Sequence, residues 1–571
     1  MSTSTLYTNG RILTMVDPDD RPEAVLVRDG RIAFVGPLDQ ARAEATVADV
    51  DQVPGTGRAS ATGDPAGAQV TEVDLDGRTL MPSFIDPHGH LYTHGVLASM
   101  VDLEHATSMA EVIQAFRERA SREDDDGASA LVGVKYDLDV LAEGRHPTRQ
   151  ELDEAAADRP VMAFHRSLHV GAVNSHLLRE AGIGADTPDP EGGRYGREAD
   201  GRTPDGYVEE HPAIAPLMPV LAPENPDSLL PTSSLPPAEV IALAAQDYLA
   251  HGITTAQDGA SDQATVGRLV QAATEGAIPL DLVCYPVVAG GVPTAFEDHP
   301  DFAGDYRGRL RLGGYKMLLD GAPQARSAWL SRPYEKVDPD DADEQPTSGY
   351  PIMTDEQVEG AARAAAANGR QLIVHCNGDA ASEQWISAVE RIAADDPAIL
   401  QQRPVMIHAQ TVRPDQLERM ARINMIASVF VGHTWFWGDV HLRNLGAERG
   451  GAISPARTAL DTGVRITLHQ DTPVTPPDMI LSIWAAVNRI SRHGTEIGPA
   501  ERISVWEALQ AVTSGAAYQY GEEAEKGQLR QGMRADLVIL SADPLAVDPA
   551  DLRDIQVVAT IKDGVELYRA G

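Results

Sequence analysis

Two histidines separated by one residue, His88 and His90, are the feature of this sequence best suited to metal chemistry. They stand in Asp-Pro-His-Gly-His, directly after the apolar residues 80–85. In an extended strand, side chains two positions apart point to the same face, so both imidazoles would be directed toward one point. Ordinary core packing does not require such a pair, whereas neutral imidazole is the commonest metal ligand in proteins. The pair therefore predicts a divalent metal site.

Four further polar residues follow or interrupt apolar segments later in the chain. His375 ends Leu-Ile-Val-His, His408 ends Val-Met-Ile-His, and Asp471 ends Ile-Thr-Leu-His-Gln-Asp. Lys316 lies inside the apolar segment Gly-Tyr-Lys-Met-Leu-Leu, where a buried ammonium is costly unless it is paired or chemically changed. Each residue would lie at or near the C-terminal end of a strand, which is where a (β/α)8 TIM barrel places its reacting groups.

The segments that would position these residues alternate between strand and helix from about residue 250 onward. Alternating strands and helices predict a parallel sheet in an α/β fold. With the strand that carries His88, the expected strands number eight, the count of a (β/α)8 TIM barrel. The other seven expected strands are 253–257, 281–288, 310–319, 371–375, 405–408, 425–431 and 466–469, with helices at 356–368 and 414–422.

The two chain ends are expected to form a separate small β-sandwich. Short apolar runs joined by Asn-Gly and Asp-Gly pairs, which are strong hairpin signals, occupy residues 5–36, and residues 535–564 repeat the pattern. We therefore expect a composite sandwich from residues 1–80 and 516–571 and a barrel from residues 81–515. The interval after the first barrel strand is far longer than one βα unit. It predicts an inserted α/β subdomain at about 105–245.

Composition argues against several classes of partner and location. A net charge of −38 disfavours binding to nucleic acid or to an anionic membrane. The sequence contains no apolar run long enough for a transmembrane helix, and its first residues lack the features of a signal peptide. The two cysteines, Cys284 and Cys376, imply no disulfide framework, so we expect a cytoplasmic protein.

Several motifs together resemble the amidohydrolase superfamily and, within it, the YtcJ-like amidohydrolase family 3. The resemblance covers nearly the whole chain. It rests on PSFIDPHGH, GYKMLLDGAPQARSAW, IVHCNGDAA, IHAQ, LHQDTPV and the tail GMRADLVILSADPL, in that order. It implies two divalent metal ions, with Zn²⁺ favoured by an imidazole-rich site and Fe, Mn, Co or Ni left open. The implied ligands are His88, His90 and Asp471 at the first ion, His375 and His408 at the second, and an N6-carboxylated Lys316 as the bridge.

The same resemblance implies hydrolysis of a carbon–nitrogen bond other than a peptide bond, in an amide or N-formyl group of a small-molecule substrate. A metal-bridging hydroxide would attack the carbonyl carbon, and Asp471 would accept the proton of the water and deliver it to the leaving group. Cleavage of an ester, lactone or carbamate, deamination, or a catalytically silent barrel scaffold are the alternatives. A homodimer rests on family analogy alone.

Three residues are candidate substrate contacts. His169 aligns with a family histidine near the substrate, and His433 and Trp435 stand in Gly-His-Thr-Trp-Phe-Trp after the seventh expected strand. The alternatives are a structural hydrogen bond for His169 and packing of the aromatic side chains against the inserted subdomain. Lys316 could likewise form an ion pair with Asp320 instead of being carboxylated.

Overall fold

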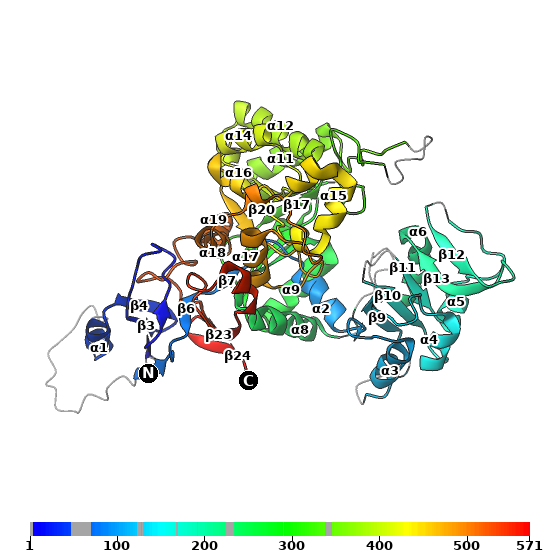
Figure 1. The fold of residues 1–571 in the computed structure, drawn as a ribbon, viewed down its shortest axis with the longest axis horizontal. Helices are drawn as coiled ribbons and strands as arrows, with labels where there is room; N and C mark the ends of the chain where they lie inside the picture. The colour runs from blue at the N-terminus through cyan, green and yellow to red at the C-terminus, as the bar shows by residue number, and fades with distance from the viewer. Residues whose placement is uncertain are drawn as a thin grey trace. The chain divides into compact units, whose positions relative to one another are not determined.

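The computed structural model divides into two compact units. One comprises Met1–Leu91 and Ala245–Gly571, and the other comprises Tyr92–Ala244 (Figure 1). In the described part of the chain, no helix combines the length and the apolar character needed to cross a membrane. The structure describes residues 4–46, 70–122, 127, 129–138, 140–166, 170–190, 192–223, 233, 235–288, 291–336 and 345–571.

Parallel strands of the first unit form two sheets, and five of these strands carry or directly precede the predicted metal ligands. The strands of the two sheets are β7 (Phe84–Ile85), β14 (Ile253–Ser261), β15 (Asp281–Pro286), β16 (Leu310–Leu312), β17 (Gly314–Leu318), β18 (Gln371–Cys376), β19 (Val405–His408), β20 (Ile426–Val429) and β21 (Ile466–Leu468). One sheet has the order β7-β14-β15-β16 and a second runs from β17 to β21 in chain order. A bridge between Val287 and Lys316, with a hydrogen bond from Val288 N to Lys316 O, connects the two sheets. The fold is therefore α/β, while closure into a barrel stays a prediction.

The expected strand 310–319 is divided in two at Gly313. The Gly313 N–H donates to Cys284 O, and a Cβ at this position would lie 2.6 Å from both Tyr285 and Val283. A residue with a side chain would therefore collide with β15. The bend lets β16 pair with β15 and β17 pair with β18.

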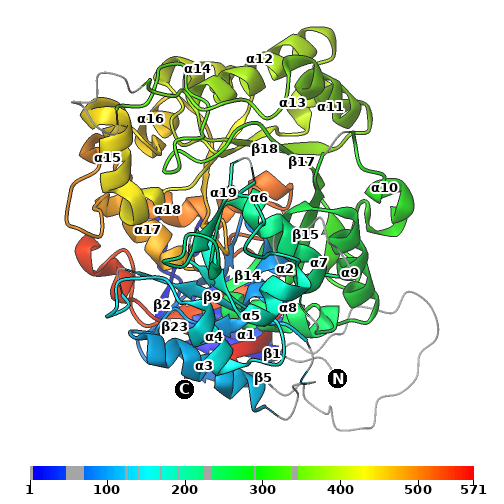
Figure 2. The ribbon, with the colours of Figure 1, turned by 90° about the vertical axis from the view of Figure 1, so that its right-hand side faces the viewer.

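Helices follow most of these strands. They are α9 (Gln263–Thr274), α11 (Asp355–Ala367), α12 (Asp379–Asp395), α14 (Pro414–Arg422), α15 (His433–Gly451), α16 (Ala456–Asp461), α17 (Met479–Asn488), α18 (Val505–Ala511) and α19 (Ser514–Tyr520). Helix α11 begins with a capping box between Thr354 and Gln357, and α14 begins with Pro414 at its first position. Figure 2 shows α11, α12 and α14 on one side of β17 and β18.

The two ends of the chain contribute two further sheets to the first unit. One has the order β4 (Arg31–Gly36), β3 (Ala24–Arg28), β1 (Ser4–Thr8), β5 (Val70–Asp74), and the other the order β2 (Arg11–Ile12), β6 (Thr79–Pro82), β22 (Leu537–Leu540), β23 (Val557–Lys562), β24 (Val565–Arg569). Asp29-Gly30 and Asp563-Gly564 close hairpins with positive φ at both positions, which is the type I′ pattern expected of Asp-Gly. One buried cluster contains side chains from both ends, including Tyr7, Leu80 and Ile561.

A buried group of charges connects β15 to the C-terminal strands. Asp281 at the start of β15 lies 2.6 Å from Lys526 Nζ and 2.8 Å from Lys562 Nζ. Lys562 also pairs with Asp536 at 2.9 Å, and Lys526 with Glu522 at 2.7 Å. Lys562 Nζ also lies 3.6 Å from Asp563, so each buried ammonium has at least two carboxylate partners, as buried charges require.

The second unit contains a six-stranded sheet of its own. Its order is β12 (Arg194–Arg197), β13 (Pro204–Glu209), β11 (Val170–Val173), β10 (Val161–His165), β9 (Leu131–Tyr136), β8 (Val101–Asp102). Alternate residues of β10 enter two different buried clusters, with Met162 and Phe164 in one and Val161 and Ala163 in the other. Both faces of the sheet are therefore covered.

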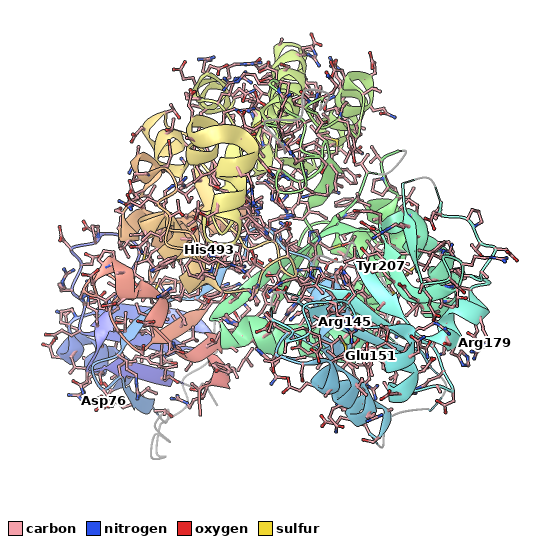
Figure 3. All side chains as sticks on the ribbon, turned by 45° about the vertical axis from the view of Figure 1, so that its right-hand side comes forward. Asp76, Arg145, Glu151, Arg179, Tyr207 and His493 are labelled. Carbon is pink, nitrogen blue, oxygen red and sulfur yellow. The ribbon has the colours of Figure 1, made fainter. Side chains whose placement is uncertain are left out.

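Helices complete the second unit. They include α3 (Met109–Ala120), α4 (Arg149–Ala155), α5 (Ser175–Glu180), α6 (His211–Ile214) and α7 (Met218–Leu221). Helix α4 begins with a capping box of Thr148 and Glu151, and Glu151 also pairs with Arg145 at 2.6 Å (Figure 3). The unit occupies most of the interval in which the inserted subdomain was predicted.

Candidate metal centre

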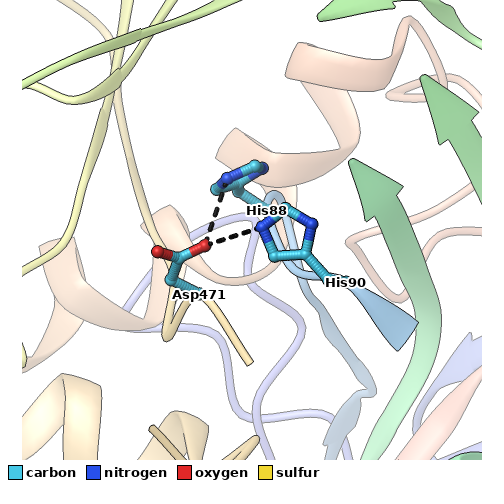
Figure 4. A group of neighbouring side chains, drawn as sticks. All are labelled: His88, His90 and Asp471. Atoms are coloured by element: carbon cyan, nitrogen blue, oxygen red, sulfur yellow. Dashed lines mark ion pairs between the residues drawn. The ribbon is translucent and has the colours of Figure 1, made fainter. Parts of the chain in front are cut away.

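His88, His90 and Asp471 converge on one point in the first unit (Figure 4). Asp471 Oδ1 lies 3.3 Å from His88 Nε2 and 3.2 Å from His90 Nε2. One ligand atom from each residue lies within 4.8 Å of the others. The site is thus formed by a segment after β7 and a segment after β21, which are far apart in sequence.

The two histidines reach this point in a way that the strand-based prediction did not anticipate. Strand β7 ends at Ile85, so the pair lies beyond it. Hydrogen bonds position the segment instead: His88 N donates to Asp86 Oδ1, and His90 N donates to Thr472 O at 2.7 Å. Gly89 leaves room for this arrangement, because a Cβ there would lie 2.8 Å from Asp86 Oδ2 and 2.9 Å from Tyr248 Oη and would force one of these side chains to move.

Hydrogen bonds fix the tautomers of both histidines. His90 Nδ1 lies 2.5 Å from Gly259 O, and a carbonyl oxygen can only accept, so Nδ1 carries the proton. His88 Nδ1 lies 2.6 Å from Gln257 Oε1. The Gln257 amide is oriented by its Nε2, which donates to Pro87 O and to Tyr520 Oη, and Tyr520 in turn donates to Asp86 O. Both Nε2 atoms therefore direct lone pairs toward Asp471.

Three electron-pair donors that face one another in a buried place require a cation. Asp471 Oδ1 is buried and accepts no hydrogen bond among the described residues. Burial, followed by the charge on Lys316, lowers the pKa of His88 to about 4, so His88 is neutral. Burial opposes a charge on His90, yet contact with Asp471 raises its pKa. A proton on His90 or a divalent cation can thus satisfy the carboxylate, and the donor set of two imidazoles and one carboxylate fits the cation.

His375 and His408 form a second convergent pair. His375 Nδ1 lies 2.9 Å from His408 Nε2. His375 Nε2 lies 3.0 Å from Asn377 Nδ2, a donor, and 3.3 Å from Gly321 O and 3.4 Å from Asp320 Oδ1, both acceptors. His375 can therefore adopt either neutral tautomer, and Nδ1 has a free lone pair when Nε2 donates to Gly321 O. Burial, with the Lys316 charge next, lowers the pKa of His375 to about 3, and burial lowers that of His408 well below its usual range. Both imidazoles are neutral, as metal ligands must be.

Lys316 contacts the first histidine pair, and its charge acts on His88 and on His375. Its Nζ is 3.1 Å from His88 Nε2, and the side chain is buried. Burial lowers the pKa of Lys316 to about 8, although the Asp471 carboxylate opposes this shift. The alternative ion pair with Asp320 is not formed in the described structure. Asp320 instead accepts backbone N–H groups from Trp329, Asn377 and Gly378.

The candidate substrate contacts have different surroundings. His433 begins α15, and its Nδ1 lies 2.8 Å from His441 Nε2. The ring centroids of His433 and Phe430 are 4.6 Å apart, and those of Phe430 and His408 are 6.0 Å apart. Trp435 packs instead against Trp484, with ring centroids 5.2 Å apart. His169 lies outside the described residues.

Sequence reasoning missed some residues that contact the predicted ligands. His469 Nε2 lies 3.2 Å from His408 Nδ1, and Gln257 and Gly259 fix the two tautomers described above. A signal for His469 was available, because His469 and Asp471 repeat the one-residue spacing of the first histidine pair. Gln257 and Gly259 lie on β14 and had no comparable signal.

Comparisons with known proteins agree with this chemistry. A family model described as the amidohydrolase family matches residues 71–568. The protein YtcJ of Bacillus subtilis (strain 168) is 28% identical over 99% of this chain and 99% of its own. N-substituted formamide deformylase of Arthrobacter pascens is 28% identical over 98% of this chain and 97% of its own. An uncharacterized metal-dependent hydrolase from Pyrococcus furiosus is 25% identical in its crystal structure, with a TM-score of 0.72, over 95% of this chain and 100% of that one.

Proposed function

We propose, because this chain belongs to the amidohydrolase family, that it is a metal-dependent hydrolase acting on carbon–nitrogen bonds outside peptides. The observation that carries the proposal is the convergence of three lone pairs, on His88 Nε2, His90 Nε2 and Asp471 Oδ1. Hydrogen bonds to Gln257 and Gly259 at the opposite ring nitrogens fix the tautomers of both imidazoles. The structural likeness to a metal-dependent hydrolase supports it.

The proposed cofactor is a pair of divalent cations, with Zn²⁺ favoured by the imidazole-rich donor set. The first would be held by His88, His90 and Asp471, and the second by His375 and His408. Lys316 would bridge them as its carbamate: the neutral amine adds to CO₂, an N–C bond forms, and one proton is lost. The lowered pKa of Lys316 favours the neutral amine that this step needs. Such cations polarise a carbonyl and lower the pKa of a water molecule.

Asp471 is the proposed proton carrier. Burial alone would raise its pKa, but His408, His88 and His90 hold the pKa well below its usual range, so the carboxylate is charged. Since its Oδ1 faces the two histidines and would hold the first cation, its second carboxylate oxygen, Oδ2, would receive a proton from the attacking water. Transfer of that proton to the departing nitrogen completes the hydrolysis.

The proposed substrate is a small molecule with an amide or N-formyl group. Its support is the likeness, over nearly the full length of both chains, to a protein named N-substituted formamide deformylase. An N-substituted formamide would yield formate and an amine. His433 is the proposed substrate contact among the described candidates, because its ring packs against Phe430, next to His408.

Metal content and formamide hydrolysis test the proposal together. The protein is purified, chelated, and reloaded with Zn²⁺ and bicarbonate, and metal is counted per chain by inductively coupled plasma mass spectrometry. Wild type should hold about two ions, and His90→Ala should hold fewer and lose formamide hydrolysis. His493→Ala, at an exposed position of the same unit, is the matched control and should behave as wild type. Wild-type protein that takes up no metal would refute the proposal.

A further inference from the structure

Four polar side chains form a continuous buried chain behind the second histidine pair. Ser428 Oγ lies 3.0 Å from His469 Nδ1, His469 Nε2 lies 3.2 Å from His408 Nδ1, and His408 Nε2 lies 2.9 Å from His375 Nδ1. The four residues belong to or directly follow the neighbouring parallel strands β18 to β21. Ser428 and His469 have no exposed surface, so the chain ends inside the protein.

When the hydrogen bonds are donated from His408 toward Ser428, the second histidine pair presents a lone pair that can bind a cation. If His408 Nδ1 donates to His469 Nε2, then His469 Nδ1 is protonated and donates to Ser428 Oγ. His408 Nε2 is then unprotonated and faces His375 Nδ1, which is also unprotonated when His375 Nε2 donates to Gly321 O. Two lone pairs 2.9 Å apart repel each other unless a cation lies between them.

The opposite direction satisfies every nitrogen without a cation. Ser428 Oγ donates to His469 Nδ1, His469 Nε2 donates to His408 Nδ1, and His408 Nε2 donates to His375 Nδ1. The number of protons on the four side chains is the same in both directions, since each histidine stays neutral and only its tautomer changes. A serine at the end of the chain permits this change, because a hydroxyl can donate or accept.

We propose that His469 is a positioning residue of the second histidine pair and that the chain from Ser428 to His375 reverses its hydrogen-bond direction when a divalent cation binds. The inference rests on the metal-dependent function proposed above. In this account His469 touches neither cation nor substrate. It accepts the Nδ1 proton of His408, and partners of this kind commonly change metal affinity about 10- to 100-fold.

Two amide variants separate this role from simple packing. In His469→Gln, the side-chain amide oxygen can occupy the place of Nε2 and still accept from His408. In His469→Asn, the shorter amide reaches only the position of Nδ1, next to Ser428. Both variants lose the imidazole from the same buried position, so a packing effect should destabilise both, and thermal unfolding of the chelated proteins measures that effect directly.

The affinity of each site is measured by titrating chelated protein with Co²⁺ against a competing chelator, with the visible cobalt absorption as a second readout. Wild type should show two sites. His469→Asn should weaken one of them about 10- to 100-fold and leave the other unchanged, whereas His469→Gln should stay within about threefold of wild type.

Other results would overturn the inference in distinguishable ways. Two unchanged sites in both variants would show that His469 does not support the pair. Equal weakening in both variants would show that the acceptor atom is irrelevant and that packing alone matters. A wild-type protein without any cobalt site would instead refute the proposed function, and this inference with it.

Discussion

Replacement of Asp281 by Asn should destabilise the first unit strongly. The carboxylate is buried and lies 2.6 Å from Lys526 Nζ and 2.8 Å from Lys562 Nζ. Removing one member of a buried ion pair costs about 3–5 kcal/mol, because a charge is left without compensation. Both lysines keep a second carboxylate, Glu522 or Asp536, so we expect the lower end of this range, about 3 kcal/mol.

The assay is urea unfolding followed by tryptophan fluorescence. All six tryptophans lie between residues 329 and 506, so their signal reports the first unit and not residues 92–244. With a slope of about 3 kcal/mol per M, a loss of about 3 kcal/mol moves the urea midpoint down by about 1 M. Asp76→Asn, at an exposed position of the same unit with a positive φ that Asn also adopts, is the matched control and should not move it.

The difference between Asp281→Asn and wild type should also depend on pH. Burial alone would raise the pKa of Asp281, but Lys526 and Lys562 lower it well below its usual range. The stabilisation is therefore complete above the unfolded pKa of about 3.9 and is lost as the pH falls through the folded value. The difference should be constant from pH 5 to 8 and should shrink in acid. A difference below about 0.5 kcal/mol at pH 7, or one that grows in acid, would refute this reasoning.

Three further predictions concern the metal centre. Gly89→Ala should lower metal content and activity, because the new Cβ would collide with Asp86 and Tyr248. The control Gly267→Ala, in α9, places its Cβ in open space and should keep the wild-type metal content. Elemental analysis of both variants tests this prediction. Lys316→Ala should reduce bound metal from about two ions to one or none, and two ions in the variant would contradict the bridging role. Chelation should lower the free energy of unfolding, followed by tryptophan fluorescence, by about 2.7 kcal/mol relative to protein at a free metal concentration of 100 Kd. An unfolding free energy that chelator does not change would argue against a metal held by the folded state.

Local sequence patterns predicted the elements that an apolar run or a helix-initiating residue marks in the sequence itself. The apolar run 405–408 and the segment 414–422, which opens with Pro414, coincide with β19 and α14. The strand expected at 310–319 fails at Gly313, because the close approach of Tyr285 from β15 is a tertiary contact that the local pattern does not contain.

The candidate site was also predictable only in part from the sequence. The histidine and carboxylate types at the ends of apolar runs suggested which side chains would gather, and their role as metal ligands stays a prediction. The sequence could not predict how they are oriented. Gln257 and Gly259 act on His88 and His90 from a strand about 170 residues away. Trp435 packs against Trp484, and α15 departs from helical geometry at Trp437; no local periodicity indicated either feature.

The hydrogen bond from Tyr520 Oη to Asp86 O, which belongs to the support behind His88, spans 434 residues of sequence. At about 5–20 residues per second, the ribosome needs roughly 20 to 90 seconds to make the stretch between these two residues. Throughout that interval the histidine pair lacks Tyr520, and for most of it Asp471 has not been made either. The support behind the proposed first metal site is therefore complete only after residue 520 has been made, and a shorter nascent chain would have no finished site to load.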